Sequence, residues 1–252
     1  MKQKIFVFAN QKGGVGKTTT AVNLGAYLSK AGKRVLLVDF DPQANSSSSV
    51  GADTDQPGIY EVITEKSDIN RAIQSTSVSG LYVIPSSINL TGAMVEFVQV
   101  DSREYLLKNS IVKINQDFDF IFIDCPPSLG ILTLNGLVAA EYVIIPLQCE
   151  YFALEGLSLL LKTINRVQQA LNPGLQIGGI LFTMYDSRTR LAREVVEEVT
   201  RYFKEKVFRT IIPRNVRLSE APSYSKPINQ YDSECIGAKS YQCLAEEVLN
   251  HV

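Results

Sequence analysis

The chain has 252 residues, of which 45% are hydrophobic and 20% are charged, and its formal net charge is −1. This apolar content excludes an intrinsically disordered chain, and no run approaches the roughly 18 unbroken apolar residues of a membrane-spanning helix. Histidine-dependent catalysis and a Cys/His metal centre are excluded by a single histidine and four scattered cysteines: His251, Cys125, Cys149, Cys235 and Cys243. We therefore expect a soluble protein of the reducing cytoplasm.

Short apolar runs alternate with longer amphipathic segments, a pattern typical of βαβ units around a parallel sheet. The sequence predicts strands at 5–9, 34–40, 81–85, 118–124, 142–147, 176–183 and 208–212. It predicts helices at 18–31, 103–115, 132–139, 154–171, 191–204 and 240–249, and a serine-rich loop at 45–58. Several strands are apolar at almost every position, as strands covered on both faces should be. We expect one α/β domain over 1–252, an open and mostly parallel twisted sheet flanked by helices on both faces.

The turn between the first strand and the first helix carries the strongest motif, Gln11-Lys12-Gly13-Gly14-Val15-Gly16-Lys17-Thr18-Thr19. Its glycines allow consecutive backbone N–H groups to point at phosphate oxygens, and the helix that follows adds its positive dipole end. Lys17 can reach the β- and γ-phosphates, and the Thr18 hydroxyl can ligate Mg²⁺. Gln11 stands where the usual motif has glycine, and a second lysine, Lys12, precedes the glycine pair. The motif predicts a P-loop NTPase fold with nucleotide bound along Lys12 to Thr19.

Two carboxylates at predicted strand ends complete this site. Asp41 precedes Pro42 after the second strand, and Asp124 precedes Cys125-Pro126-Pro127 after the strand at 118–124. Ligands of an open parallel sheet lie beyond the carboxyl ends of its strands, so both acids should face the phosphate loop. We expect Thr18, Asp41 and Asp124 around the magnesium, with Asp41 orienting the attacking water. Asp39 should point to the opposite face, and strand-end aspartates before proline also serve as turn caps.

These motifs together resemble the deviant Walker A ATPases of the MinD/ParA (SIMIBI) superfamily, and within it the ParA/Soj-type chromosome and plasmid partition ATPases. The resemblance covers almost the whole chain, and the segments that carry it are 12–20, 39–43, 124–128, 150–156 and 212–222. It implies an ATPase that forms an ATP-sandwich homodimer, binds double-stranded DNA without sequence preference and is stimulated by a ParB/Spo0J-type partner. It also implies a cytoplasmic, nucleoid-associated protein.

The resemblance assigns roles to particular residues. Lys12 matches the lysine that crosses the dimer to the partner's phosphates, a role similar to that of an arginine finger. Asp41 matches the residue that positions the hydrolytic water, and Asp124 matches the Walker B aspartate. The adenine base is expected on the loop of Pro213, Arg214 and Asn215, with Met184 packing nearby.

Charge is unevenly distributed along the chain. Between residues 186 and 217 there are nine Lys or Arg and five acids, a local net charge of +4 in a chain of −1. A basic face of this kind suits contacts with DNA phosphates. Arg188 and Arg217 are the leading expected DNA contacts, followed by Lys204 and Arg209. The alternative is an ordinary solvated helix face.

Other functions on the same loop stay open at this point. A MinD-like regulator of division-site placement would need a basic amphipathic C-terminal helix, whereas 244–252 contains Glu246 and Glu247 and no Lys or Arg. An iron–sulfur reductase similar to the nitrogenase iron protein needs two cysteines near its symmetry axis, and Cys125 lies inside the turn after Asp124. A small-molecule kinase would leave Lys12 without a purpose. Because the C-terminal segment lacks basic residues, we expect no membrane partner.

Overall fold

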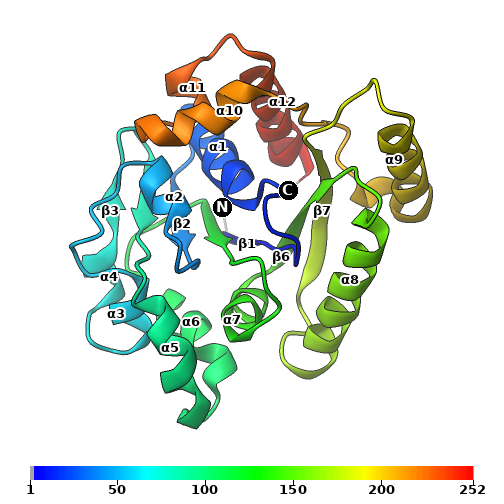
Figure 1. The fold of residues 1–252 in the computed structure, drawn as a ribbon. Helices are drawn as coiled ribbons and strands as arrows, with labels where there is room; N and C mark the ends of the chain where they lie inside the picture. The colour runs from blue at the N-terminus through cyan, green and yellow to red at the C-terminus, as the bar shows by residue number, and fades with distance from the viewer. Residues whose placement is uncertain (1–2, 252) are drawn as a thin grey trace.

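A seven-stranded sheet runs through the computed structural model, which describes residues 3–251 (Figure 1). The strand order is β3-β4-β2-β5-β1-β6-β7, and all neighbours are parallel except β3, which is antiparallel to β4. The strands are β1 Lys4–Phe8, β2 Val35–Asp39, β3 Gln74–Ser75, β4 Leu81–Ile84, β5 Phe120–Asp124, β6 Tyr142–Gln148 and β7 Gln176–Thr183. This is the predicted open, mostly parallel α/β sheet.

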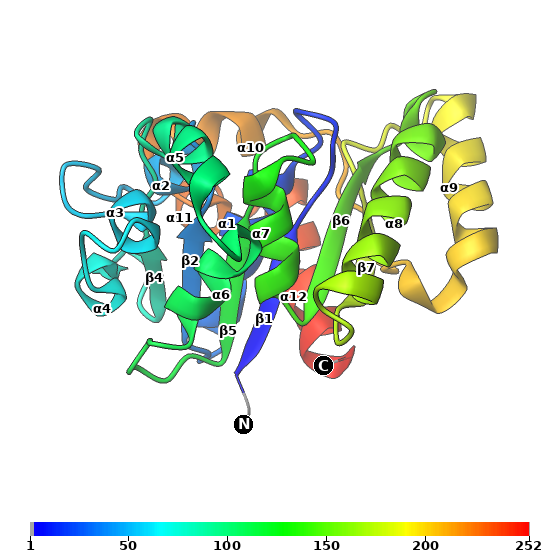
Figure 2. The same ribbon diagram turned by 90° about the horizontal axis from the view of Figure 1, so that it is seen from below.

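Helices cover both faces of the sheet. One layer holds α1 and α12, and the opposite layer holds α6, α7 and α8, as the view from below makes plain (Figure 2). The α-helices in the first half are α1 Lys17–Lys30, α2 Asn45–Ser49, α3 Ile59–Ile63, α4 Ile69–Ala72, α5 Leu90–Glu96 and α6 Leu106–Ile111. Those in the second half are α7 Ile131–Ala139, α8 Ala153–Ala170, α9 Arg190–Phe203, α10 Val216–Glu220, α11 Ile228–Tyr231 and α12 Ile236–His251. Short 3₁₀ turns are η1 Phe97–Gln99, η2 Arg103–Tyr105, η3 Lys204–Lys206 and η4 Ala221–Tyr224.

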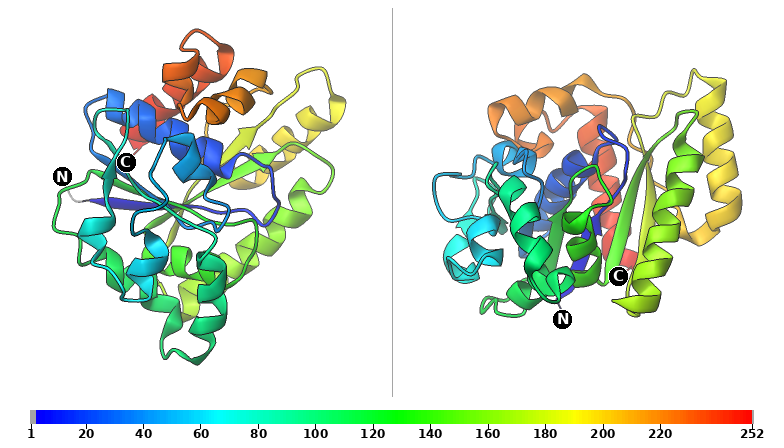
Figure 3. Two further views of the ribbon diagram at one scale, coloured as in Figure 1. Left: turned by 60° about the vertical axis from the view of Figure 1, so that its left-hand side comes forward. Right: turned by 60° about the horizontal axis from the view of Figure 1, so that its bottom comes forward.

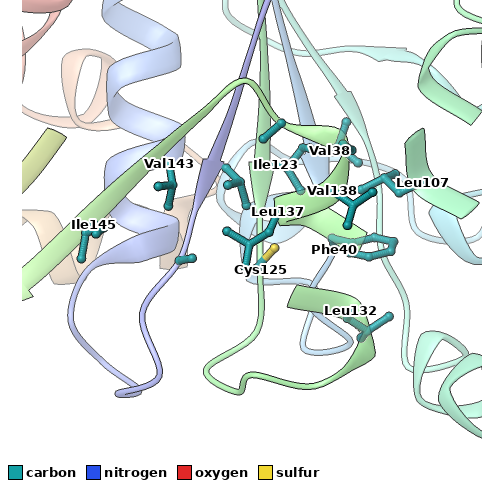
Figure 4. Close-up of a cluster of buried hydrophobic side chains, with 14 of the residues drawn as sticks. Val38, Phe40, Leu107, Ile123, Cys125, Leu132, Leu137, Val138, Val143 and Ile145 are labelled. Atoms are coloured by element: carbon teal, nitrogen blue, oxygen red, sulfur yellow. The ribbon is translucent and has the colours of Figure 1, made fainter. Parts of the chain in front are cut away.

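The alternation of side chains along β5 explains the two layers. Phe120 and Phe122 pack into the core under α1 and α12, whereas Ile121 and Ile123 pack into the core under α7. Both sets are almost fully buried, as the all-apolar sequence of this strand predicted. Figure 4 shows the second core, where Ile123 and Cys125 lie beside Leu137 of α7. The two cores fix the carboxyl end of β5 from both sides.

One predicted strand is wrong. The segment 208–212 is not a strand: it bonds to β7 only where the Phe208 and Ile212 N–H groups donate to Ile180 and Phe182. Between them the N–H groups of Arg209 and Thr210 donate to the Glu247 carboxylate of α12 instead, at 2.7 and 3.0 Å. A side chain from another element therefore takes the donors that a strand ladder would use.

The serine-rich stretch 45–58 is not entirely a loop, because α2 occupies Asn45–Ser49. The predicted helix at 103–115 is also shorter, with a 3₁₀ turn followed by α6. The short edge strand β3 was not predicted. None of the described helices has the length and hydropathy needed to cross a membrane.

The right-hand edge of the molecule in Figure 1 is built from α8 and α9 beyond β7, and the two views of Figure 3 place both helices away from α2 and β4. The carboxyl ends of β1, β2 and β5 lie together at one end of the sheet, since Phe8 is opposite Asp124 and Asp124 is opposite Asp39. The fold therefore brings the first loop and both strand-end acids to one place.

Candidate functional site

The turn between β1 and α1 has a backbone conformation suited to binding an anion. Gly14 and Gly16 have φ of +70° and +85°, a left-handed conformation that a residue with a Cβ rarely adopts. α1 begins at Lys17, directly after Gly16, so the first N–H groups of a 14-residue helix open onto the turn. Thr183 of β7 donates its hydroxyl to the Val15 carbonyl at 2.8 Å and so holds the turn from behind.

Lys17 lies inside this loop rather than in solvent. It is 6% exposed, and its Nζ donates to the Lys12 carbonyl at 3.3 Å. Burial lowers the pKa of Lys17, and nearby acids, first of all Asp124, oppose that shift. A buried cation held over the loop is placed to meet phosphate oxygens, and the predicted contact with phosphate stays a prediction.

Asp124 ends β5 and is 1% exposed. Its Oδ2 accepts hydrogen bonds from the Thr18 hydroxyl at 2.7 Å and from the Ser46 hydroxyl at 2.8 Å. Its Oδ1 is buried and has no hydrogen-bond partner among the described residues. Burial raises the pKa of Asp124 to about 6, although both hydroxyl groups and Lys17 oppose the shift. A buried carboxylate oxygen without a partner, next to a threonine hydroxyl, fits a hard divalent cation or its water ligand.

Asp39 and Asp41 differ in what they face. Asp41 is 6% exposed, accepts from the Gln43 N–H at 3.0 Å and lines the central cavity. Asp39 is fully buried behind it, and its Oδ2 accepts from the N–H and the hydroxyl of Ser47 at 2.8 and 2.7 Å. Burial, with the charge of Asp124, raises the pKa of Asp39 to about 7. Asp41 therefore borders the site, and Asp39 supports the chain around it.

A cavity of about 410 Å³ extends from the loop across the end of the sheet. Among the residues named from the sequence, its lining includes Gly14, Gly16, Lys17, Thr18, Thr19, Asp41, Met184, Pro213 and Asn215. Met184, Pro213 and Asn215, which the sequence assigned to the adenine base, thus line the same cavity as the phosphate loop. Arg214 does not line this cavity; it borders a second hollow of about 340 Å³ with Glu150, Asp186 and Arg188.

Lys12 lies at the rim of the site. Its Nζ forms an ion pair with Glu150, which follows β6, and both side chains are about half exposed, at 45% and 47%. The Lys12 N–H is held by the Asn10 side chain at 3.0 Å. The backbone of Lys12 thus belongs to the phosphate loop, while its charge points to the outer edge of the loop.

The four predicted DNA contacts do not form one cluster. Arg188 precedes α9 and pairs with Asp186 at 2.7 Å, and Lys204 begins the 3₁₀ turn after the helix, about 20 Å away by the helical rise. Arg217 lies on α10 and pairs with Glu220 at 2.9 Å. Lys204 and Arg209 are exposed, and within residues 3–251 no ion pair joins either side chain to an acid.

Sequence reasoning missed the serines of α2. Ser46 and Ser47 are fully buried and donate to Asp124 and Asp39, which lie on neighbouring strands. Asn45, Ser48 and Ser49 line the cavity. The available signal was a polar run directly after a strand-end Asp-Pro, because polar groups at that edge of a parallel sheet meet the ligand.

A glycine loop that opens a helix, a buried lysine and carboxylates at the ends of adjacent parallel strands define a P-loop nucleotide-binding protein. Residues 3–177 match the family described as AAA domain. The chain is 60% identical over 246 residues to the chromosome-partitioning ATPase Soj of Treponema pallidum, covering 98% of this chain and 97% of that protein. It is 54% identical over 248 residues to the sporulation initiation inhibitor protein Soj of Bacillus subtilis, covering 97% and 98%.

Among solved structures, a crystal structure described as cobyrinic acid a,c-diamide synthase from Mycobacterium smegmatis, with a bound ATP analogue and magnesium, is 40% identical. It covers 99% of this chain and 96% of that chain, with a TM-score of 0.86. The chain belongs to the ParA/Soj-type family of partition ATPases, as its motifs predicted.

Proposed function

We propose that this protein is an ATP-dependent dimerising switch of DNA segregation. It binds Mg-ATP, closes as a homodimer over two nucleotides, binds double-stranded DNA without sequence preference and slowly hydrolyses ATP. A ParB/Spo0J-type partner accelerates hydrolysis and releases the protein from the nucleoid. Two findings support this proposal. The Treponema relative is described as a chromosome-partitioning ATPase and the Bacillus relative also carries the name Soj. The Mycobacterium structure contains an ATP analogue and magnesium.

The position of Lys12 is the observation that best supports an ATP-dependent dimer. Lys17 is buried inside its own loop and its Nζ donates to the Lys12 carbonyl, so it is the cation placed to bind the phosphates of its own protomer, and Lys12 is left for another role. Lys12 is half exposed at the rim, held by Glu150. When a second protomer approaches this edge, Lys12 can leave Glu150 for the partner's phosphate oxygens, where a cation stabilises the charge of the transferring group.

The residues at the end of the sheet fit magnesium. No group of three or more His, Cys, Asp or Glu side chains within residues 3–251 could hold a metal unaided. Mg²⁺ usually keeps several waters and shares one or two protein ligands with phosphates, so Thr18 and Asp124, with Asp41 nearby, are a sufficient set. The bound ion would neutralise charge on the phosphate oxygens. Asp41, at the cavity wall, would orient the attacking water.

The proposal is tested by binding to a random-sequence duplex DNA with ATP, with ADP and without nucleotide, over a salt series. DNA binding only with ATP, weakening steeply as salt rises, is the expected result. Binding that ignores the nucleotide would contradict the switch. ATP-dependent dimers that bind no DNA in any state would favour the MinD-like alternative, a regulator acting at a membrane or through proteins.

A further inference from the structure

The two carboxylate oxygens of Asp124 have different surroundings. Oδ2 accepts two hydrogen bonds, from Thr18 at 2.7 Å and from Ser46 at 2.8 Å. Oδ1 is buried and accepts none from the described residues. An ionised carboxylate has about four lone-pair sites, and a buried one left bare is costly. The protein therefore supplies hydrogen bonds to Oδ2 and leaves the buried Oδ1 without a partner among the described residues.

Ser46 is held rigidly in the place from which it donates. It is fully buried in α2, and the next residue, Ser47, donates twice to Asp39. Asp39 is opposite Asp124 in the register of β2 and β5. Two consecutive serines thus bind α2 to the ends of two adjacent strands, and the Ser46 hydroxyl has a fixed direction toward Asp124.

Thr18 and Ser46 differ in what else they can do. A threonine hydroxyl has one proton and two lone pairs, so Thr18 can ligate a cation and still donate to Asp124. Ser46 approaches Asp124 from α2, an element separate from the phosphate loop. Without Ser46, only the Thr18 hydrogen bond would remain to fix the orientation of the carboxylate.

We infer that Ser46 is a positioning residue of the magnesium site: with Thr18 it occupies Oδ2 of Asp124 and so reserves Oδ1 for Mg²⁺ or one of its water ligands. This inference rests on the proposed binding of Mg-nucleotide. It assigns a role to a serine of α2, outside the phosphate-loop motif.

The test is a calorimetric titration of Mg²⁺ into the ADP-saturated protein, with Ser46→Ala beside the wild type. Loss of a group that orients a metal ligand typically weakens metal binding 10- to 100-fold, so we expect about a tenfold weaker Mg²⁺ affinity. ADP binding in EDTA should stay within about twofold, because the Ser46 hydroxyl donates to Asp124 and Ser46 does not line the cavity. Mg²⁺ requires stricter geometry than Ca²⁺, so the ratio of Mg²⁺ to Ca²⁺ affinity should also fall.

Ser29→Ala is the matched control, since this buried hydroxyl donates to the Gly25 carbonyl inside α1 at 2.9 Å and is expected to leave Mg²⁺ affinity unchanged. If Ser46→Ala does not fold, Ser46→Cys places a slightly larger side chain with only a weak donor at the same position and carries the same expectation. Wild-type Mg²⁺ affinity and selectivity in a folded Ser46 variant would overturn the inference alone. A wild-type protein that binds no Mg²⁺ with ADP would overturn the proposed function as well.

Discussion

The phosphate end of the sheet and the α8–α9 edge differ in the burial of their charged side chains and in the partners of those side chains. At the phosphate end, Lys17, Asp39, Asp41 and Asp124 are all buried, and their partners come from three separate elements. At the outer edge, the Arg188 and Arg190 side chains are 86% and 87% exposed, and each pairs with an acid two or four residues away. The first region is fixed by tertiary contacts and the second by its own sequence neighbours.

This difference predicts how each region responds to change. A buried charge that loses a partner keeps its full desolvation cost, so single substitutions at the phosphate end should have large effects. Exposed ion pairs contribute little each and are screened by salt. The effects of substitutions at the outer edge should therefore be small, additive and dependent on ionic strength.

The largest effect is expected for Lys17→Ala. It removes the buried cation over the loop, and we expect at least a 100-fold loss of nucleotide affinity, measured by titration with a fluorescent ATP analogue. Lys12→Ala is the matched variant, because it removes the neighbouring cation at the rim. That variant should bind nucleotide within about threefold of wild type yet fail to form ATP-dependent dimers in sedimentation. Equal losses of affinity in both variants would erase the distinction between the two lysines.

Asp41→Ala should come next. It leaves the loop and Lys17 in place, and we expect ATP binding to persist while the hydrolysis rate falls about 100-fold, so that an ATP-bound dimer accumulates. Phosphate release in single-turnover experiments measures the rate. Asp117→Ala changes an exposed acid that does not line the cavity, and it should behave as wild type. Unchanged hydrolysis in Asp41→Ala would remove Asp41 from its proposed role.

The buried acids should make stability depend on pH. The pKa of Asp39 is raised to about 7 and that of Asp124 to about 6, mainly by burial, whereas both lie near 3.8 in the unfolded chain. The folded state thus binds protons that the unfolded state has lost, and its added stability disappears as pH rises through 6 to 7.

We therefore expect the free energy of unfolding of the nucleotide-free protein to be about 4 kcal/mol higher at pH 5 than at pH 7.5, since each carboxyl contributes about 1.4 kcal/mol per pH unit below its folded-state pKa. Urea unfolding at the two pH values measures it. Asp39→Asn should remove the larger part of the difference. A protein that is equally stable at both values, or less stable at pH 5, would mean that these carboxyls are ionised throughout.

The smallest effects are expected for the exposed basic residues between 186 and 217. Lys204→Ala and Arg209→Ala should each weaken DNA binding of the ATP state about threefold and lower the salt slope by about one. Arg188→Ala should do less, because Asp186 already holds that guanidinium. Fluorescence anisotropy over a salt series measures both quantities, with Lys113→Ala, exposed and outside the basic segment, as control. If one of these exposed substitutions lowered DNA affinity 100-fold, the basic residues would be as sensitive to single changes as the phosphate end.

Much of the site was predictable because its signals are local. The glycine loop, Lys17 and Thr18 lie within eight residues, and strands buried on both faces are apolar throughout, so loop, helix and sheet follow from short windows. The prediction at 208–212 was wrong because Glu247, nearly 40 residues away, takes the N–H groups that the apolar pattern assigned to a ladder. α2 was missed because serine is a weak helix former, and the carboxylates that hold Ser46 and Ser47 come from other strands.

The sequence by itself determined the fold class, the phosphate loop and the family, since each depends on residue types at short spacing. Only the tertiary structure decided that Glu150 pairs with Lys12 across 138 positions and that Ser46 and Thr18 both donate to Asp124. It also decided that Arg214 borders a separate hollow and not the cavity at the phosphate loop. The physical reason is that a buried carboxylate is satisfied by whichever donors the packed sheet brings to it. Those donors are set by strand register and helix packing, which short stretches of sequence do not encode.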